Sequence, residues 1–116
     1  MIHKKNSLND ASVGDLQARR AVLARDLPSV EGVLRGSLQR QYRKCGRKGC
    51  RCNQGELHGP YLYLAVRNQE RRGLVYVSAD VAQEVERRVE VAGKVEEVLA
   101  EISAINIELL ARGELD

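Results

Sequence analysis

The sequence predicts an α+β fold: a small three-stranded antiparallel sheet with a Cys/His loop, flanked in the chain by an N-terminal helix and a long C-terminal coiled-coil-like helix. Apolar residues recur at three- and four-residue steps in residues 12–27 and 80–111, as in amphipathic helices. Between them, short β-prone runs are separated by turn formers. The chain contains four Tyr but no Phe or Trp, so its core depends on aliphatic side chains, which favours packing between helices.

The first helix is expected to start at Ser12. This serine and Asp15 form a capping box, in which the serine oxygen accepts a hydrogen bond from an amide of the first turn. The helix should end near Leu27, because the residue before a proline, here Pro28, is disfavoured in helical geometry. Arg20 interrupts its apolar face, which consists of Val13, Leu16, Leu23 and Leu27.

Three strands are expected in the middle of the chain. The pattern over residues 37–43 indicates the first strand, and residues 61–66 and 74–77 are β-prone runs that a turn can join into a hairpin. Alternation puts Tyr61 and Tyr63 on one face of the hairpin and only aliphatic side chains on the other. We expect the aliphatic face to pack against a helix.

A long helix is expected from a second capping box, at Asp80 and Gln83, to about Ala111. Arg88 and Asn106 interrupt a heptad-like apolar seam. The seam consists of Val81, Val85, Ala92, Val95, Leu99, Ile102 and Leu109. Further apolar residues widen this stripe until it can contact two neighbours, such as the first helix and a partner subunit. We therefore expect a homodimer through this helix.

By composition the chain divides into a flexible tail (1–11), a helix with its connector (12–34), a basic β domain with the Cys/His loop (35–79) and the C-terminal helix (80–116). The basic domain carries ten basic and two acidic residues, whereas the C-terminal helix carries ten acidic and four basic residues. This asymmetry indicates an anionic partner for the basic domain. The alternative is that the basic and acidic segments pair with each other.

All three cysteines of the chain lie within eight residues, in the pattern Cys45-x4-Cys50-x-Cys52-x5-His58. Thiolate and imidazole are preferred zinc ligands, and the glycines of this loop let the backbone bring four such side chains together. We therefore expect a structural zinc site closed by four protein ligands. The alternative is that the cysteines are reduced thiols and that His58 is a turn residue, since the spacing lacks the paired C-x2-C of a zinc finger.

Cations surround the expected zinc site. Arg and Lys neutralise phosphates, and tyrosines on an outer sheet face can stack on unpaired bases, although strand tyrosines are more often half-buried packing residues. The candidate nucleic-acid-binding residues are Arg40, Arg43, Lys44, Arg47, Lys48, Arg51, Arg67, Arg71, Arg72, Tyr61 and Tyr63. They predict a nucleic-acid partner, with DNA favoured over RNA.

Three motifs resemble the core of a family of small uncharacterised bacterial, archaeal and phage proteins: Gly36-Ser37-Leu38, Cys45-Gly46 … Gly49-Cys50-Arg51-Cys52 and His58-Gly59-Pro60-Tyr61. The family shares this GSL … CGxxGCxC … HGPY core and a C-terminal helix motif similar to Glu101-Ile102 … Ile105-Asn106. The resemblance covers residues 36–110 and implies no established reaction, cofactor or substrate. It implies an association with mobile elements, often near transposase-like genes, and that the four Cys/His residues belong to one unit.

These observations predict a small, non-catalytic, nucleic-acid-binding accessory or regulatory protein. An enzyme is disfavoured because His58 is the one imidazole outside the tail, and no acidic dyad or Ser-His-Asp set is visible. The alternative is a protein-interaction module, such as an adaptor, an antitoxin-like partner or an oligomeric scaffold, that assembles through its C-terminal helix. No run of about 20 apolar residues and no secretory signal is visible, so we expect a cytoplasmic protein without membrane association.

Overall fold

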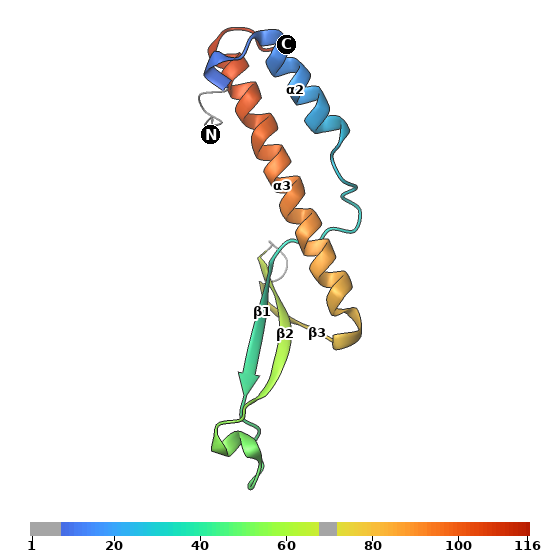
Figure 1. The fold of residues 1–116 in the computed structure, drawn as a ribbon, viewed down its shortest axis with the longest axis vertical. Coiled ribbons are helices and arrows are strands. Elements are labelled where there is room, and N and C mark those ends of the chain that lie inside the picture. The colour runs from blue at the N-terminus through green and yellow to red at the C-terminus, as the bar shows by residue number, and fades with distance from the viewer. Residues whose placement is uncertain (1–7, 68–71) are drawn as a thin grey trace. The chain divides into compact units, whose positions relative to one another are not determined.

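The computed structural model describes residues 8–67 and 72–116 and confirms the α+β fold (Figure 1). Its elements are helices α2 (Val13–Arg25) and α3 (Ala82–Ala111), strands β1 (Ser37–Arg43), β2 (His58–Arg67) and β3 (Arg72–Val77), and the 3-10 helices η1 (Arg51–Gln54) and η2 (Ala79–Val81). None of the described helices combines the length and the apolar composition that crossing a bilayer requires.

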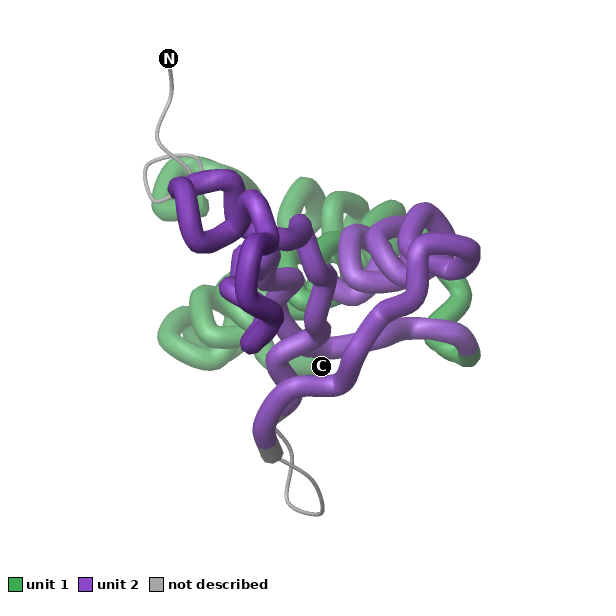
Figure 2. The backbone as a smooth tube through the Cα atoms, turned by 90° about the horizontal axis from the view of Figure 1, so that it is seen from below, with its two compact units in different colours: residues 1–31, 93–116 green, residues 32–92 purple. Residues whose placement is uncertain are grey.

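The chain forms two compact units (Figure 2). Residues 1–31 and 93–116 make up the first, here called the helical unit, and residues 32–92 make up the second, here called the sheet unit. Helix α3 contributes to both, because the boundary falls between Ala92 and Gly93.

The core of the helical unit lies between α2 and α3, as the apolar stripes of the sequence predicted. Its buried side chains are Leu16, Leu23, Val98, Ile105 and Leu109. Residues 8–10 are helical, and Leu8 and Ala11 pack against this core. The flexible tail expected over residues 1–11 therefore does not include Leu8 to Ala11, and residues 1–7 lie outside the described part of the chain.

The ends of both helices follow local signals in the sequence. The Ser12 hydroxyl accepts a hydrogen bond from the Asp15 amide at 3.0 Å, as the predicted capping box requires. Helix α2 ends at Arg25, two residues earlier than Leu27, yet Leu27 still packs against the core. Helix α3 ends at Ala111 as predicted, where Gly113 takes a positive φ of 73°.

The start of α3 differs from the prediction. A 3-10 turn, η2, precedes the helix, and its N-cap is Ser78 rather than Asp80. The Ser78 hydroxyl donates a hydrogen bond to the Asp80 carboxylate. Because η2 occupies the positions of the expected first helical turn, the predicted capping box at Asp80 and Gln83 is wrong.

The sheet has the order β1-β2-β3, and both strand pairs are antiparallel. Residues paired directly across the strands share a face, so Gln39, Tyr63 and Tyr76 lie in one row and Leu38, Leu64 and Val75 lie in the next row, on the opposite face. Leu64 on the aliphatic face is buried. On that same face Arg40 pairs with Glu86 of α3 at 3.3 Å. The first turns of α3 therefore reach the aliphatic face, as expected.

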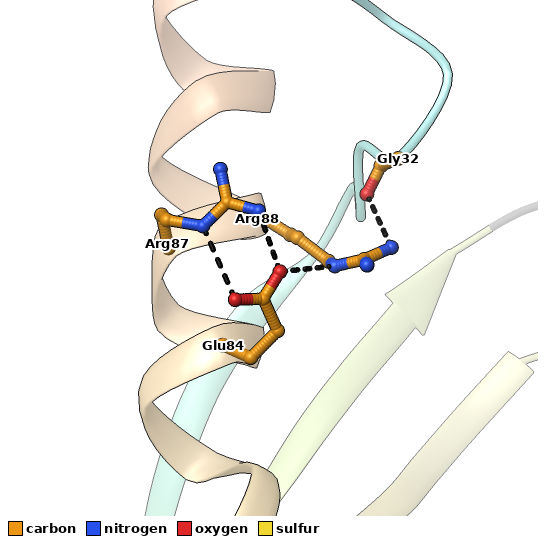
Figure 3. A network of polar contacts seen from close by, with 4 residues as sticks. All are labelled: Gly32, Glu84, Arg87 and Arg88. Carbon is orange, nitrogen blue, oxygen red and sulfur yellow. Dashed lines mark hydrogen bonds and ion pairs between the residues drawn. The ribbon is translucent and has the colours of Figure 1, made fainter.

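Arg88, a polar interruption of the predicted seam, holds the connector before β1 against α3. Its guanidinium pairs with Glu84 at 2.8 Å and donates a hydrogen bond to the Gly32 carbonyl at 3.3 Å (Figure 3). Arg87 also pairs with Glu84. The Leu34 amide in turn donates to the Arg88 carbonyl at 3.4 Å. The polar interruption is thus a tertiary contact within the sheet unit.

Candidate metal centre and the basic loop around it

The four side chains of the predicted zinc site converge. The ligand atoms of Cys45, Cys50, Cys52 and His58 all lie within 4.8 Å of one another, and the three cysteines are free thiols. The sulfurs of Cys45 and Cys52 are 3.6 Å apart, and the Cys50 sulfur is 3.1 Å from Nε2 of His58. Two sulfurs on one tetrahedral zinc ion are about 3.8 Å apart, given Zn–S bonds of about 2.3 Å. The spacing therefore suits four-coordinate metal binding.

Cys50 and Cys52 are separated by one residue, so the backbone must bend tightly for both side chains to reach the cluster. A 3-10 turn provides this bend. Cys50 is the N-cap of η1, and its carbonyl accepts a hydrogen bond from the Asn53 amide at 3.0 Å. This turn directs Cys52 inward, where its side chain is fully buried. The Cys45 amide donates a hydrogen bond to the Cys52 sulfur at 3.3 Å, which links the first and the third cysteine of the cluster.

His58 is the first residue of β2 rather than a turn residue. It pairs with Arg43 across the sheet, next to an irregularity in the register between Gln41 and Arg43. At Gly59, where φ is 131°, a Cβ atom would lie 2.6 Å from the Gln41 carbonyl oxygen. Only glycine allows the two strands to approach this closely, and the approach brings the imidazole to the cysteines.

The cluster favours a thiolate at Cys50. Hydrogen bonding from the Cys52 backbone, followed by hydrogen bonds with the thiols of Cys45 and Cys52 and the His58 ring, lowers the pKa of the Cys50 thiol to about 6. Burial instead raises the pKa of the Cys52 thiol. Metal binding requires deprotonated thiols, so Cys50 is more readily available as a ligand at neutral pH than Cys52.

Exposed cations lie between and beside the four ligands. Arg47 and Lys48 are exposed in the stretch between Cys45 and Cys50, and Lys44 is exposed just before it. Two predicted binding residues are paired with acids: Arg40 with Glu86 at 3.3 Å and Arg51 with Glu56 at 3.8 Å. Pairing of basic and acidic groups thus occurs, but among the described side chains it does not extend to Lys44, Arg47 or Lys48.

Of the remaining candidate cations, Arg43 lies on the tyrosine face of the sheet. The Arg43 guanidinium lies 5.2 Å from the centre of the Tyr63 ring and 5.6 Å from that of Tyr61. Arg67 ends β2 and Arg72 begins β3, and their backbones pair, but their side chains lie outside what the structure describes. Arg71 lies outside the described residues altogether.

Tyr76 belongs to the same surface, although the sequence analysis did not include it among the binding residues. It lies directly opposite Tyr63, and the two rings contact edge to face with centroids 5.7 Å apart. Alternation within a single strand identifies the face that Tyr61 and Tyr63 share. Only the register between β2 and β3 adds Tyr76, and the alternation within one strand does not define that register.

The comparisons with known proteins give a family for this chain. A family model described as Domain of unknown function (DUF6788) matches residues 14–87. The chain belongs to this family. The matched span contains α2 except its first residue, the whole sheet and all four Cys/His residues, and it ends within α3. No curated protein and no solved structure matches the chain. The family's distribution among organisms and its link to mobile elements stay predictions.

Proposed function

We propose that this chain is a small nucleic-acid-binding accessory or regulatory protein, in which a structural zinc knuckle presents arginine and lysine to phosphates. One observation carries the proposal. Arg47 and Lys48 are exposed on a loop whose ends converge on Cys45, Cys50, Cys52 and His58. Phosphate binding by such cations releases counterions, and a rigid loop loses little conformational entropy on binding.

Zinc is the metal that this donor set fits best. Three sulfurs and one imidazole nitrogen suit a tetrahedral zinc ion, whereas iron–sulfur clusters are held mainly by thiolates. With four protein ligands the ion would have no position for an activated water, so the role that we propose for this site is structural rather than catalytic. Native mass spectrometry of purified protein should show one zinc ion per chain. Protein that carries no metal when purified and does not take up zinc on titration would instead support the alternative of bare reduced thiols.

Binding should depend on the loop cations. The double variant Arg47→Ala/Lys48→Ala should weaken binding to a DNA oligonucleotide, and it should reduce the slope of log K against log salt by about 2, since each lost phosphate contact contributes about 0.9. The control is Arg25→Ala/Lys94→Ala, which removes one arginine and one lysine from exposed positions in the helical unit. Fluorescence anisotropy at several salt concentrations measures both effects.

Two results would contradict the assignment. If both double variants weaken binding equally, net charge rather than the loop is responsible. If the wild-type protein shows no salt-dependent binding to DNA or RNA, the proposed function is wrong.

The cytoplasmic location and the link to mobile elements are further parts of the proposal. The composition supports the location, and the sequence resemblance supports the link. DNA is favoured over RNA, and the same titration with an RNA oligonucleotide tests that preference.

A second candidate function, a protein-interaction module, is favoured by an apolar surface on the helical unit. Leu99, Ile107, Leu110 and Leu115 are all exposed and line a hollow of about 350 Å³. Of the predicted heptad seam, Leu99 lies on this surface, whereas Ala92, Val95 and Leu109 are buried within the chain. We favour a second copy of the chain as its occupant, because two copies of one apolar surface can cover each other about a two-fold axis. Light scattering should then show a dimer, and Leu110→Glu should make it monomeric. A wild-type monomer at all accessible concentrations would exclude the homodimer. The two functions are compatible, because a dimer doubles the basic surface.

A further inference from the structure

The tyrosine face of the sheet contains a hollow beside the Cys/His loop. It has a volume of about 420 Å³ and is lined by Tyr61, Tyr63, Tyr76, Arg43 and Lys44, together with Cys45 and His58. Its volume is within the range of small-molecule sites, about 300–1,000 Å³. The hollow lies entirely within the sheet unit, and all of its lining residues are described.

Tyr61 and Tyr63 are half-buried on this face, and Tyr76 beside them is exposed. The opposite face of the sheet buries aliphatic side chains such as Leu64. Tyr76, in contrast, is 57% exposed although its ring contacts Tyr63. An exposed tyrosine ring beside two half-buried ones leaves aromatic surface uncovered that a ligand can contact.

The positively charged side chain of Arg43 lies beside these tyrosines and lines the same hollow. The Arg43 guanidinium lies over the rings of Tyr61 and Tyr63 and donates hydrogen bonds to the Tyr63 hydroxyl and, at 3.2 Å, to Oε1 of Gln41. These contacts orient the guanidinium without neutralising it. Among the described residues no carboxylate pairs with Arg43 or Lys44. The rim of the hollow therefore keeps two positive charges next to one exposed and two half-buried aromatic rings.

We propose that this hollow is a subsite for one unpaired nucleobase of a single strand, with the adjoining phosphate bound by Arg43 and Lys44. Aromatic rings beside a cationic groove are the usual means of holding single strands, because every base has a face that can stack. A base within a duplex is already stacked on both sides and cannot enter a concave site unless it leaves the helix. The inference rests on the proposed function and adds to it a preference for single-stranded substrate.

The test compares Tyr76→Leu with Tyr42→Leu. Tyr42 is a matched control because it is 56% exposed and lies in the same basic segment, but it does not line the hollow. Binding is measured to a single-stranded oligonucleotide and to the duplex of the same sequence, and 2-aminopurine in the single strand reports stacking through its fluorescence. Tyr76→Leu should weaken single-strand binding about 5- to 150-fold, the range expected for the loss of one base–aromatic stack. It should not change duplex binding or the salt dependence, and Tyr42→Leu should change neither.

The outcomes separate the subsite from the proposed function. If Tyr76→Leu has no effect while Arg47→Ala/Lys48→Ala weakens binding, the nucleic-acid function stands and the nucleobase subsite is wrong. An equal loss in the two tyrosine variants, or equal losses on single strand and duplex, also overturns the subsite. If the wild-type protein binds no oligonucleotide, both proposals fail. Circular dichroism and zinc content, unchanged in each variant, confirm that the loop is intact.

Discussion

Different kinds of side chain stabilise the helical unit and the Cys/His loop of the sheet unit. The helical unit buries a continuous aliphatic cluster: Leu16, Leu23, Val98, Ile105 and Leu109. In the loop of residues 44–57 of the sheet unit, one residue alone is buried, and that residue is Cys52. The loop has almost no apolar burial of its own, so the hydrophobic effect cannot hold it in one conformation.

This difference shows how one small chain can contain both a unit stabilised by aliphatic burial and an exposed, charged loop. Aliphatic burial stabilises the helical unit without any ligand. The loop has to keep its cations in water and therefore depends on the convergence of Cys45, Cys50, Cys52 and His58. A metal at that point would provide the stabilisation that burial does not, which is the usual situation of small metal-dependent motifs.

The largest expected effect is that of metal removal on the loop. Structural zinc contributes about 10–16 kcal/mol in zinc-finger peptides, so its removal should unfold the loop completely. Hydrogen exchange should show rapid loss of protection at the amides of Cys45, Asn53 and Glu56, each of which donates a hydrogen bond within the loop. The amides of α2 and of residues 98–109 in α3 should keep their protection.

The control for metal removal is a chain in which all three cysteines are replaced by serine, which chelator should leave unchanged. Simultaneous loss of protection in both units would show that they unfold as one, and the contrast drawn between them would be wrong. Unchanged protection of the loop after complete removal of metal would show that the four side chains hold the loop without an ion.

The next effect is that of a cavity in the helical core. Leu109 is fully buried, whereas its neighbour Leu110 is 61% exposed. Leu109→Ala should reduce the free energy of unfolding by about 2–5 kcal/mol, because it removes buried methylene and methyl groups and leaves a cavity. Leu110→Ala should change it by less than about 0.5 kcal/mol in monomeric protein. Urea denaturation followed by circular dichroism measures both values.

Measuring the zinc content of Leu109→Ala tests whether the loop depends on the helical core. Leu109→Ala should retain its metal, because the loop lies in the other unit. Loss of zinc from this variant would show that the loop depends on the helical core. A destabilisation by Leu110→Ala that grows with protein concentration would instead report the proposed dimer, because mass action couples stability to association.

The smallest effect concerns the ion pairs at the start of α3. Hydrogen bonds from Arg87 and Arg88 lower the pKa of the Glu84 carboxyl to about 2, below its ordinary value near 4.5. The folded state therefore binds the proton less tightly than the unfolded state does. The stabilisation is fully present above the ordinary pKa and is lost as the pH falls towards 2. NMR titration of the Glu84 carboxyl carbon should locate this pKa directly.

The stability of a Glu84 variant tests the same contact. Glu84→Gln should lower the stability at pH 7, and the difference from wild type should shrink as the pH falls below about 4.5. Glu90→Gln removes the same charge from an exposed position of α3 and serves as the control. If the two substitutions have the same pH dependence, the network around Arg88 does not stabilise the sheet unit.

Features that depend on neighbouring residues were predicted well from the sequence. The cap at Ser12, the strand over residues 37–43 and the end of α3 at Ala111 all agree with the structure. The grouping of the three cysteines with His58 was visible in the spacing as well. In each case backbone hydrogen bonds over a few residues, or ligands within one short loop, decide the outcome. The error at the start of α3 is also local, because a 3-10 turn over residues 79–81 precedes the helix.

The sequence by itself determined the kinds of element, their order and the four side chains that converge on one point. Tertiary structure alone decided which polar residues meet: Arg88 contacts Gly32, 56 residues away, and Arg20 donates a hydrogen bond to Asn106, 86 residues away. It also decided that Tyr76 joins Tyr63. These contacts depend on strand register and helix packing, in which many weak interactions act together, and no short stretch of sequence contains that information.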